Sequence, residues 1–577
     1  MTPDNGKNIT QSLNPAYLYL LALKGAGGFT AIVAEDLSGE YATIEAAVAA
    51  GEKYIFVKDG AYSLTADLVL EGVTIIGQST QGVIVSLTHT IQMADANNST
   101  VAGTARFTNN DKTVNGGGAS FNSVPTANPN KYIYAGGILG EIDSIGGANS
   151  MELFSAFFGP TLDVDGATYT FAHQTFDVDA VGSRIENLTI IHSPAGADNA
   201  LEISGIRSVV KNINFRAIGI TSTFIACPRN AAQISVLTTI EKCRFEGGDV
   251  GISLFNAKHT RVVDCDFFAN ASAGMELNAD AFNTVIEKNR FAGLTLGINL
   301  AGNAQRTSIL NNHFVQTETY AISMNRAGSE IFAVIHGNFF DECNPSSGAP
   351  YAVYIDADYI IITDNTWVGG DRCLYFADSQ NVVISNNLFK WWGSYAITMD
   401  AVNTQRNFKI IGNTFTAESG HVDQCLNLDG SELVCEGNTF QNVEEYCITS
   451  AALYASISHN TFFDCGHCVL IENGGIYSKI IGNSMFSCAY SIIVQAGGDS
   501  ATVMGNSIID DTQEGIVISS DYCIIEGNRV ENCTSNNIQI DATADRAIIT
   551  GNISLNSGGT NILNNGTNTV AANNITA

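Results

Sequence analysis

The sequence predicts an all-β fold, a right-handed, single-stranded parallel β-helix in which short strands stack coil on coil. Two observations lead to this prediction. A motif centred on asparagine returns every 22–27 residues from Asn289 to Asn552, and a second strand-like segment follows each asparagine about ten residues later. Such a period is one coil of a β-solenoid, which grows by stacking and so accommodates 577 residues without several globular domains.

The repeated motif places an aliphatic residue before the asparagine and an aromatic or aliphatic residue after it, as in EKNRF, TDNTW, IGNTF and SHNTF. Because side chains alternate between the two faces of a strand, the flanking apolar residues should point inward. Asparagine tolerates the left-handed conformation of a tight bend, and its amide can bond to the asparagine of the next coil. We expect one internal ladder that includes Asn387, Asn413, Asn438 and Asn460.

The 13 cysteines follow the same repeat. Cys343, Cys465 and Cys488 each lie five residues after a motif asparagine. Equivalent positions stack in successive coils, so the sequence predicts ladders of buried thiols. Cys465, His467 and Cys468 have a spacing that is compatible with zinc, but both cysteines already occupy core positions, and we expect neither a metal nor a cofactor.

The charge and hydropathy of the chain argue against nucleic acid and membranes as its partners. The net charge of −30 and the isoelectric point near 4.5 disfavour nucleic acid and anionic membrane surfaces, which attract basic proteins. The sequence contains no run of 18 apolar residues, so we expect no membrane-spanning helix. The apolar stretch Tyr17–Leu23 is too short to cross a membrane and lacks the flanks of a signal peptide, so no export signal is expected.

The N-terminal part differs from the repeats. Thr43–Gly51 predicts a short apolar helix, and strands are expected at Tyr54–Val57 and Val73–Ile76 with the turn KDGAY between them. This order, which ends in the strand GVTIIGQ, resembles the pectate-lyase-like β-helix superfamily, whose members often open with such a helix. The resemblance extends over roughly residues 40–90 and 180–577. It implies the fold and not one chemistry, since the superfamily includes lyases, hydrolases, epimerases and non-catalytic adhesins.

These features divide the chain into five segments. We expect an N-terminal arm (1–39), a capping helix with the first coils (40–90), a loop-rich insertion (91–180), the main parallel β-helix (181–555) and a polar terminal coil (556–577).

Candidate catalytic residues come from the outward positions of the second strand of each coil, because β-helix enzymes act on the outer face. One predicted outward row contains Ser253, Glu276, Asn299, Ser323, Tyr354, Tyr375, Thr398 and Asn427. The next row contains Asp356, Asp400 and Asp429. Coils lie about 4.8 Å apart, so Asp400 and Asp429 should be about 5 Å apart and Asp356 about 10 Å from Asp400. Glycosidases use carboxyl pairs about 5–9.5 Å apart. The alternative is that each Asp only forms the turn at its strand end.

Aromatic residues gather in the same coils. All three tryptophans of the chain lie in two neighbouring repeats, close to several tyrosines and to Arg372. Flat aromatic rings bind the apolar faces of sugars, and a guanidinium can bind an acidic sugar. The candidate substrate-binding residues are therefore Tyr354, Tyr375, Trp367, Trp391, Trp392 and Arg372.

The outward row becomes apolar toward the C-terminus, at Leu470, Ile493 and Val517. A strand that is apolar on both faces is usually covered on both faces. We expect another copy of the chain to cover it. The missing signal peptide, the N-terminal arm and the long lateral face resemble a phage tailspike, and this resemblance implies a parallel homotrimer.

Three functions remain open. The favoured one is a virion-surface, tailspike-like protein that binds and depolymerises a host surface polysaccharide, as a hydrolase or, less favoured, a lyase. It would be made in the host cytoplasm and would join other virion proteins through the N-terminal arm. The second is a non-catalytic structural or adhesive β-helix of a virion. The third, a secreted bacterial lyase or epimerase, is disfavoured because neither an export signal nor calcium-binding nonapeptides are found.

Overall fold

The computed structural model describes residues 28–577 with interruptions, and for residues 91–174 it describes the strands alone. The first part of the predicted N-terminal arm, residues 1–27, lies outside the described residues. The interruptions are 88–90, 94–98, 103, 108–110, 118–129, 136–137, 148–149, 158–161, 165–167, 175–181, 193–198, 205–206, 218–222, 228–234, 279, 303, 326–330, 344–350, 401–404 and 419–423. The chain divides into two compact units, Met1–Arg244 and Phe245–Ala577, which are described separately.

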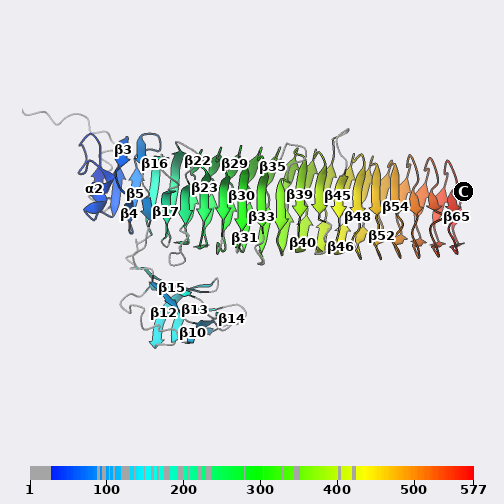
Figure 1. Cartoon of the computed structure of the whole chain (residues 1–577), viewed down its shortest axis with the longest axis horizontal. Coiled ribbons are helices and arrows are strands. Elements are labelled where there is room, and N and C mark those ends of the chain that lie inside the picture. The colour runs from blue at the N-terminus through cyan, green and yellow to red at the C-terminus, as the bar shows by residue number, and fades with distance from the viewer. Residues whose placement is uncertain are drawn as a thin grey trace, which may run out of the picture. The chain divides into compact units, whose positions relative to one another are not determined.

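The second unit is a right-handed parallel β-solenoid, which confirms the predicted fold class. Each coil contributes one strand to each of three series, and every strand pairs in parallel with its counterpart one coil later. Figure 1 shows these coils stacked from green to red. The pairing places equivalent residues of successive coils directly beside one another, so any property of one position becomes a row along the surface or the core.

The strands of the three series have the following bounds. Series 1 consists of β23 (Val250–Leu254), β27 (Ala273–Leu277), β30 (Leu296–Ala301), β33 (Tyr320–Asn325), β36 (Val353–Asp356), β39 (Arg372–Phe376), β42 (Tyr395–Met399), β45 (Gln424–Leu428), β48 (Tyr446–Ser450), β51 (His467–Ile471), β54 (Tyr490–Val494), β57 (Ile516–Ile518), β60 (Ile538–Ile540) and β63 (Ile562–Asn564). Series 2 consists of β25 (Arg261–Val263), β28 (Val285–Glu287), β31 (Thr307–Leu310), β34 (Ala333–His336), β37 (Ile360–Thr363), β40 (Gln380–Ser385), β43 (Arg406–Ile411), β46 (Ser431–Glu436), β49 (Ser456–Ser458), β52 (Lys479–Ile481), β55 (Thr502–Met504), β58 (Ile524–Glu526), β61 (Ile548–Thr550) and β64 (Val570–Ala572). Series 3 consists of β26 (Asp266–Phe268), β29 (Arg290–Ala292), β32 (His313–Val315), β35 (Phe339–Asp341), β38 (Thr366–Val368), β41 (Leu388–Lys390), β44 (Thr414–Thr416), β47 (Thr439–Gln441), β50 (Thr461–Phe463), β53 (Ser484–Phe486), β56 (Ser507–Ile509), β59 (Arg529–Glu531), β62 (Ile553–Leu555) and β65 (Ile575–Thr576).

A column of stacked aromatic rings runs through the core behind series 3. Neighbouring rings are near-parallel, with centroids 4.5–5.0 Å apart. Each ring comes from the residue two positions after the motif residue, which is Cys265 for Phe267 and an asparagine for the other rings, as the alternation of a strand requires. The column consists of Phe267, Phe291, Phe314, Phe340, Trp367, Phe389, Phe415, Phe440 and Phe462.

The predicted asparagine ladder is confirmed. The side-chain amide of Asn387 donates to Oδ1 of Asn413 at 3.0 Å, and the same bond continues to Asn438 and Asn460. These four side chains are at most 2% exposed. Each amide also donates to a backbone carbonyl in the preceding coil, as Asn413 does to Ile384 at 2.9 Å. The buried amides are therefore satisfied, which removes the cost of burying them.

The left-handed bend falls one residue earlier than we expected. Asn386, with φ of 56°, adopts it, whereas the following ladder residue Asn387 does not. The bend residue points outward and the ladder residue must point inward, so one asparagine cannot do both. Asn187 and Asn212 in the first unit have φ of 59° and 52° and occupy the same bend position.

The cysteines are buried free thiols, as predicted. All 13 lie in the described part of the chain, and none is disulfide-bonded. Burial raises the pKa of the Cys373 and Cys447 thiols well above the usual range, so these groups are protonated and behave as small apolar side chains.

The first unit begins with β1 (Ala31–Val33) and the predicted capping helix, α2 (Ile44–Ala49), whose N-cap Thr43 accepts a hydrogen bond from the amide of Ala46 at 3.1 Å. Further parallel strands follow on both sides of the insertion. They are β2 (Tyr54–Val57), β3 (Gly60–Leu64), β4 (Leu68–Leu70), β5 (Thr74–Gly77), β6 (Val83–Leu87), β7 (Ile91–Met93), β16 (Arg184–His192), β17 (Asn199–Ile203), β18 (Val209–Ala217), β19 (Thr223–Cys227) and β21 (Thr239–Glu241). Three further strands remain. Two are short, β20 (Ser235–Val236) and β24 (Ala257–Lys258), and the third, β22 (Arg244–Glu246), contains the boundary between the two units.

The insertion is a sheet and not only loops. Between residues 91 and 180 eight strands form an antiparallel sheet in the order β14-β9-β10-β13-β12-β11-β15-β8. The sequence has strand-like stretches at Lys131–Tyr134 and Ala167–Phe171, but its many Gly, Asn and Ala residues favoured loops for the rest. The bounds are β8 (Ser99–Ala102), β9 (Thr104–Phe107), β10 (Asp111–Gly117), β11 (Asn130–Ala135), β12 (Ile138–Gly147), β13 (Ser150–Phe157), β14 (Leu162–Val164) and β15 (Thr168–Gln174). Within the described ranges, no helix has the length and apolar character needed to cross a membrane.

Candidate functional site

The outward rows of series 1 have the register that the sequence predicts. Ser323 pairs with Tyr354, Tyr354 with Tyr375, and Tyr375 with Thr398. Thr398 in turn pairs with Asn427. The predicted row is thus continuous, and the coils around β36, β39 and β42 carry its aromatic part.

Five half-buried tyrosines gather on this part of series 1, and we name them the tyrosine face: Tyr320, Tyr351, Tyr354, Tyr375 and Tyr395. Tyr375 is the centre, because its ring lies 4.5 Å from that of Tyr351 and 5.6 Å from that of Tyr354, at angles of 22° and 24°. Tyr320 contacts Tyr354 at 5.5 Å in a tilted arrangement. Stacked rings of this kind hold one another in place, so the face is preorganised.

Arg372 is held between two of these rings. Its guanidinium lies 5.2 Å from the ring centroid of Tyr351 and 5.7 Å from that of Tyr395. Asp371, only 8% exposed, lies 3.5 Å from the guanidinium Nε and accepts a hydrogen bond from Ser394 at 2.6 Å. The rings and the carboxylate fix the orientation of a cation that lies on the outer surface.

Two of the three predicted carboxylates act on the tyrosine hydroxyls. Burial and the neighbouring carboxylate of Asp400, which accepts a hydrogen bond from Tyr375, raise the pKa of Tyr375 to about 12. Burial, followed by the charge of Asp356, raises the pKa of Tyr354. Asp400 follows β42 and Asp356 ends β36, two coils earlier, which corresponds to roughly 10 Å at the usual strand spacing.

Asp429 has a local structural role. Its Oδ1 accepts a hydrogen bond from the amide of Gly430 at 2.6 Å, and Gly430 has φ of 104°. This is the turn-forming role that the sequence left open for an Asp at a strand end.

Two of the predicted sugar-binding tryptophans are in the core. Trp367 is 1% exposed and stacks between Phe340 and Phe389, so its ring cannot meet a surface ligand. Trp392 is also 1% exposed, and its indole N–H donates to the carbonyl of Gln424 at 3.2 Å. The prediction was wrong for both, because it considered only which coils contain the tryptophans and not whether their positions point into the core. Trp391, by contrast, is 51% exposed.

The apolar row that suggested an interface is only partly uncovered. Leu470 is 4% exposed and is therefore already covered by its own chain, which contradicts its expected exposure. Ile493 and Val517 are half-buried. Three residues of series 2 in the last coils are more exposed and lie in register: Ile524 at 37%, Ile548 at 44% and Val570 at 57%.

Among the described residues, no group of three or more His, Cys, Asp and Glu side chains could hold a metal ion. His467, which belongs to the Cys-x-His-Cys spacing, stacks between Tyr446 and Tyr490 with ring centroids 4.5 and 4.8 Å away. Cys465 and Cys468 point into the thiol ladder beside Cys488.

Sequence reasoning missed three members of the tyrosine face as site residues: Tyr320, Tyr351 and Tyr395. The signal was present, because each of these residues lies three positions before the outward row of its coil, at or just before the start of the series 1 strand. Reading that position from coil to coil would have joined them to Arg372.

A model of the family described as right handed beta helix region matches residues 176–340 and 351–508, which is more than half of the chain. Similar solved structures include the tailspike protein gp49 from Pseudomonas phage LKA1, with 13% identity, a TM-score of 0.38, and coverage of 80% of this chain and 75% of that one. Tailspike protein 3 of bacteriophage CBA120 has 12% identity, a TM-score of 0.44, and coverage of 81% and 62%. The pre-mature gene product 12 of bacteriophage phi29 has 12% identity, a TM-score of 0.44, and coverage of 96% and 74%. No curated protein matches the sequence. The chain belongs to the right-handed β-helix family.

Proposed function

We propose that this chain binds a polysaccharide along the tyrosine face, as a tailspike-like protein of a virion surface that recognises a host surface glycan. The observation that supports this is the cluster of stacked, half-buried tyrosines that holds Arg372 between two rings and Asp400 beside Tyr375. Tyrosine offers a flat apolar ring for the face of a sugar and a hydroxyl for its polar edge. The cation and the carboxylates add donors and acceptors for hydroxyl or acidic groups.

We also propose that the chain depolymerises the polysaccharide that it binds. Asp400 and Asp356 would be the catalytic carboxyl pair of a glycosidase, with Trp391 as a further contact to the glycan. A separation near 10 Å suits an inverting hydrolase, which needs about 6.5–9.5 Å for the attacking water, better than a retaining one.

A non-catalytic adhesive spike is the second candidate. It is favoured by Asp429, because one oxygen of its carboxylate accepts a hydrogen bond from the amide of Gly430, a turn-forming role that needs no catalysis. Incubation of the protein with purified capsular polysaccharides and lipopolysaccharides separates the two. Binding with new reducing ends supports depolymerisation, binding without them supports adhesion, and no binding to any of them rejects both.

We further propose that the chain forms a homotrimer through exposed apolar residues of the last coils, and that other virion proteins join it through the N-terminal arm. Ile524, Ile548 and Val570 make a row that water disfavours. Light scattering tests the trimer: a trimeric mass that becomes monomeric in Ile548→Asp supports this row, whereas a monomeric wild type rejects it.

A further inference from the structure

A cavity of about 520 Å³ lies on the outer surface of the first unit. Its residues come from the turn before β6, from β6, β16 and β18, and from the turn between β21 and β22 with the first residue of β22. Successive parallel pairings bring these strands side by side. Its size falls within the roughly 300–1,000 Å³ that is usual for small-molecule sites. The lining residues are Thr80, Gln81, Ile84, Thr189, Ile191, Asn212, Ile213, Asn214, Arg216, Lys242 and Arg244.

The lining carries cations and no carboxylate. Arg216, Lys242 and Arg244 belong to it, and all three are exposed. The whole chain has 27 Lys and Arg against 57 Asp and Glu, so three cations without an acidic residue among the described lining residues run against its composition. The nearest carboxylate in sequence, Glu241, pairs with Lys211 at 3.2 Å and Lys242 at 3.3 Å, and it is not part of the lining. The lining residues themselves therefore carry a net positive charge, on a protein whose net charge is −30.

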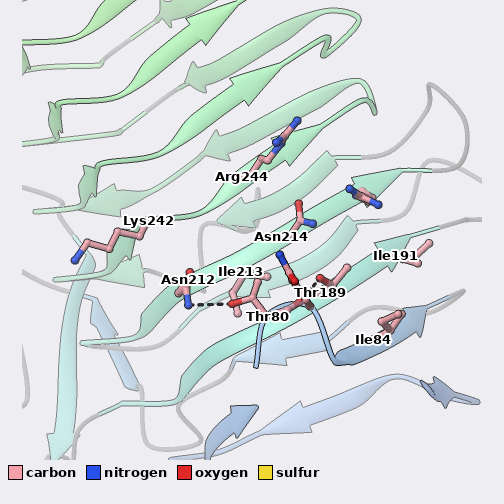
Figure 2. Close-up of a pocket in the computed structure, with 11 residues that line it drawn as sticks. Thr80, Ile84, Thr189, Ile191, Asn212, Ile213, Asn214, Lys242 and Arg244 are labelled. Carbon is pink, nitrogen blue, oxygen red and sulfur yellow. Dashed lines mark hydrogen bonds between the residues drawn. The ribbon is translucent and has the colours of Figure 1, made fainter. Parts of the chain in front are cut away.

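Hydroxyl and amide groups form the rest of the polar wall. Thr189 donates to the carbonyl of Thr80 at 2.6 Å, and the Asn212 amide donates to the Thr80 hydroxyl at 3.0 Å, as Figure 2 shows. These bonds fix the floor beside Asn214. The Asn214 side-chain oxygen is buried and has no hydrogen-bond partner among the described residues, so the site has an unused acceptor.

The cavity has a polar and an apolar end. In Figure 2 Lys242 lies at one end, Arg244 and Asn214 lie near the middle, and Ile84 and Ile191 lie at the other end. Both isoleucines are half-buried and offer aliphatic surface. A ligand that suits this wall carries a negative charge, hydroxyl donors and a patch of C–H surface together.

We propose that this cavity binds the anionic residue of a saccharide, a sugar that carries a carboxylate or a phosphate. Arginine and lysine bind the anionic group by charge-assisted hydrogen bonds. Ring hydroxyls donate to Asn214 and bond to the threonines, and the carbons of the ring contact the isoleucines. The inference rests on the proposed function, which makes a polysaccharide the ligand of the chain, and it adds a second site that selects glycans by charge.

The test is isothermal titration of the full chain with two tetrasaccharides of the same linkage, β-1,4-tetraglucuronate and cellotetraose, and with inorganic phosphate. We expect tetraglucuronate to bind at least tenfold more tightly than cellotetraose, and its affinity to fall with added salt. Lys242→Gln/Arg244→Gln should lower tetraglucuronate affinity at least tenfold. Lys409→Gln, which removes an exposed cation from β43, should leave it unchanged.

Several outcomes overturn the inference. Equal affinity for both tetrasaccharides, or unchanged affinity in Lys242→Gln/Arg244→Gln, removes charge selection from the cavity. If phosphate displaces tetraglucuronate from the wild type but does not bind to Lys242→Gln/Arg244→Gln, a sugar phosphate replaces the uronate as the source of the anion, and the site stands. If phosphate binds there and tetraglucuronate does not, the cavity is a phosphate site and the saccharide is rejected. If Tyr375→Ala abolishes glycan binding while the double variant does not, the inference fails and the proposed function stands.

Discussion

The hydroxyl group of Tyr375 is hydrogen-bonded to the carboxylate of Asp400, which belongs to the next coil of series 1. The pair joins a ring of the tyrosine face to one of the two candidate catalytic carboxylates. Because the pKa of Tyr375 is raised to about 12, the phenol is protonated at neutral pH and can donate this hydrogen bond.

Replacing Asp400 by Asn keeps its shape and its bond to Tyr375 but removes its charge. We expect the release of reducing ends from a bound polysaccharide to fall by about 10²-fold or more, the usual contribution of a general acid or base. Glycan affinity should change little. A reducing-end assay with Asp464→Asn as control, an exposed Asp in the bend conformation that Asn tolerates, measures the effect. Full activity of Asp400→Asn would exclude it from catalysis.

A buried carboxyl in the thiol ladder makes stability depend on pH. Asp511 takes the cysteine position of its coil, accepts a hydrogen bond from Ser491 at 2.6 Å, and burial raises its pKa to about 8. The unfolded pKa is near 3.8, so the folded state binds the proton more tightly. This contribution to stability is complete below about pH 4 and is lost as the pH rises toward 8, at up to about 1.4 kcal/mol per pH unit.

Urea unfolding of the wild type and Asp511→Asn at pH 5 and pH 8 tests this. We expect the wild type to lose stability between these values and the variant to lose much less, because Asn cannot ionise. The same loss in both proteins would assign the pH dependence to other groups.

The asparagine ladder should contribute strongly to stability. Asn413→Ala leaves the backbone N–H of Asn387 and the backbone carbonyl of Ile384 without their partners. At about 1–3 kcal/mol for each buried group, we expect a loss of roughly 2–6 kcal/mol. Asn427→Ala, on the outward face of β45, should cost less than about 0.5 kcal/mol. Equal midpoints of urea unfolding for the two variants would contradict the ladder's role.

The two adjacent tryptophans should behave in opposite ways. Trp392→Ala opens a cavity in the core and should cost about 3–5 kcal/mol. Trp391→Ala removes a half-exposed ring and should change the free energy of unfolding by less than about 1 kcal/mol. The difference between the two urea midpoints is the measurement, and a stable Trp392→Ala would place that ring at the surface.

The repeat made much of this molecule predictable. The pairing of Tyr354 with Tyr375 follows from the period alone, as does the burial of the motif asparagines. The burial of the tryptophans was equally readable: Trp367 lies two residues after Asn365, where other coils place phenylalanine, and Trp392 lies five residues after Asn387, where they place cysteine.

Other features needed coordinates. The cavity of the first unit joins Thr80 to Thr189 and Asn212 across the insertion, and no period relates these residues. The clamp on Arg372 depends on ring orientation at the edge of a strand, which alternation does not specify. The role of Asp429 in its turn depends on the backbone of Gly430.

Binding of a surface polysaccharide by tyrosine-face variants tests the central claim most directly. Oligosaccharides of the polysaccharide that the wild type binds would be titrated against Tyr375→Ala and against Tyr490→Ala. The second variant removes a stacked, half-buried tyrosine of the same series, five coils beyond β39. We expect Tyr375→Ala to lose at least tenfold in affinity, and Tyr490→Ala to bind as the wild type does, with both proteins folded by circular dichroism. Unchanged affinity in Tyr375→Ala would contradict the account and place the glycan elsewhere.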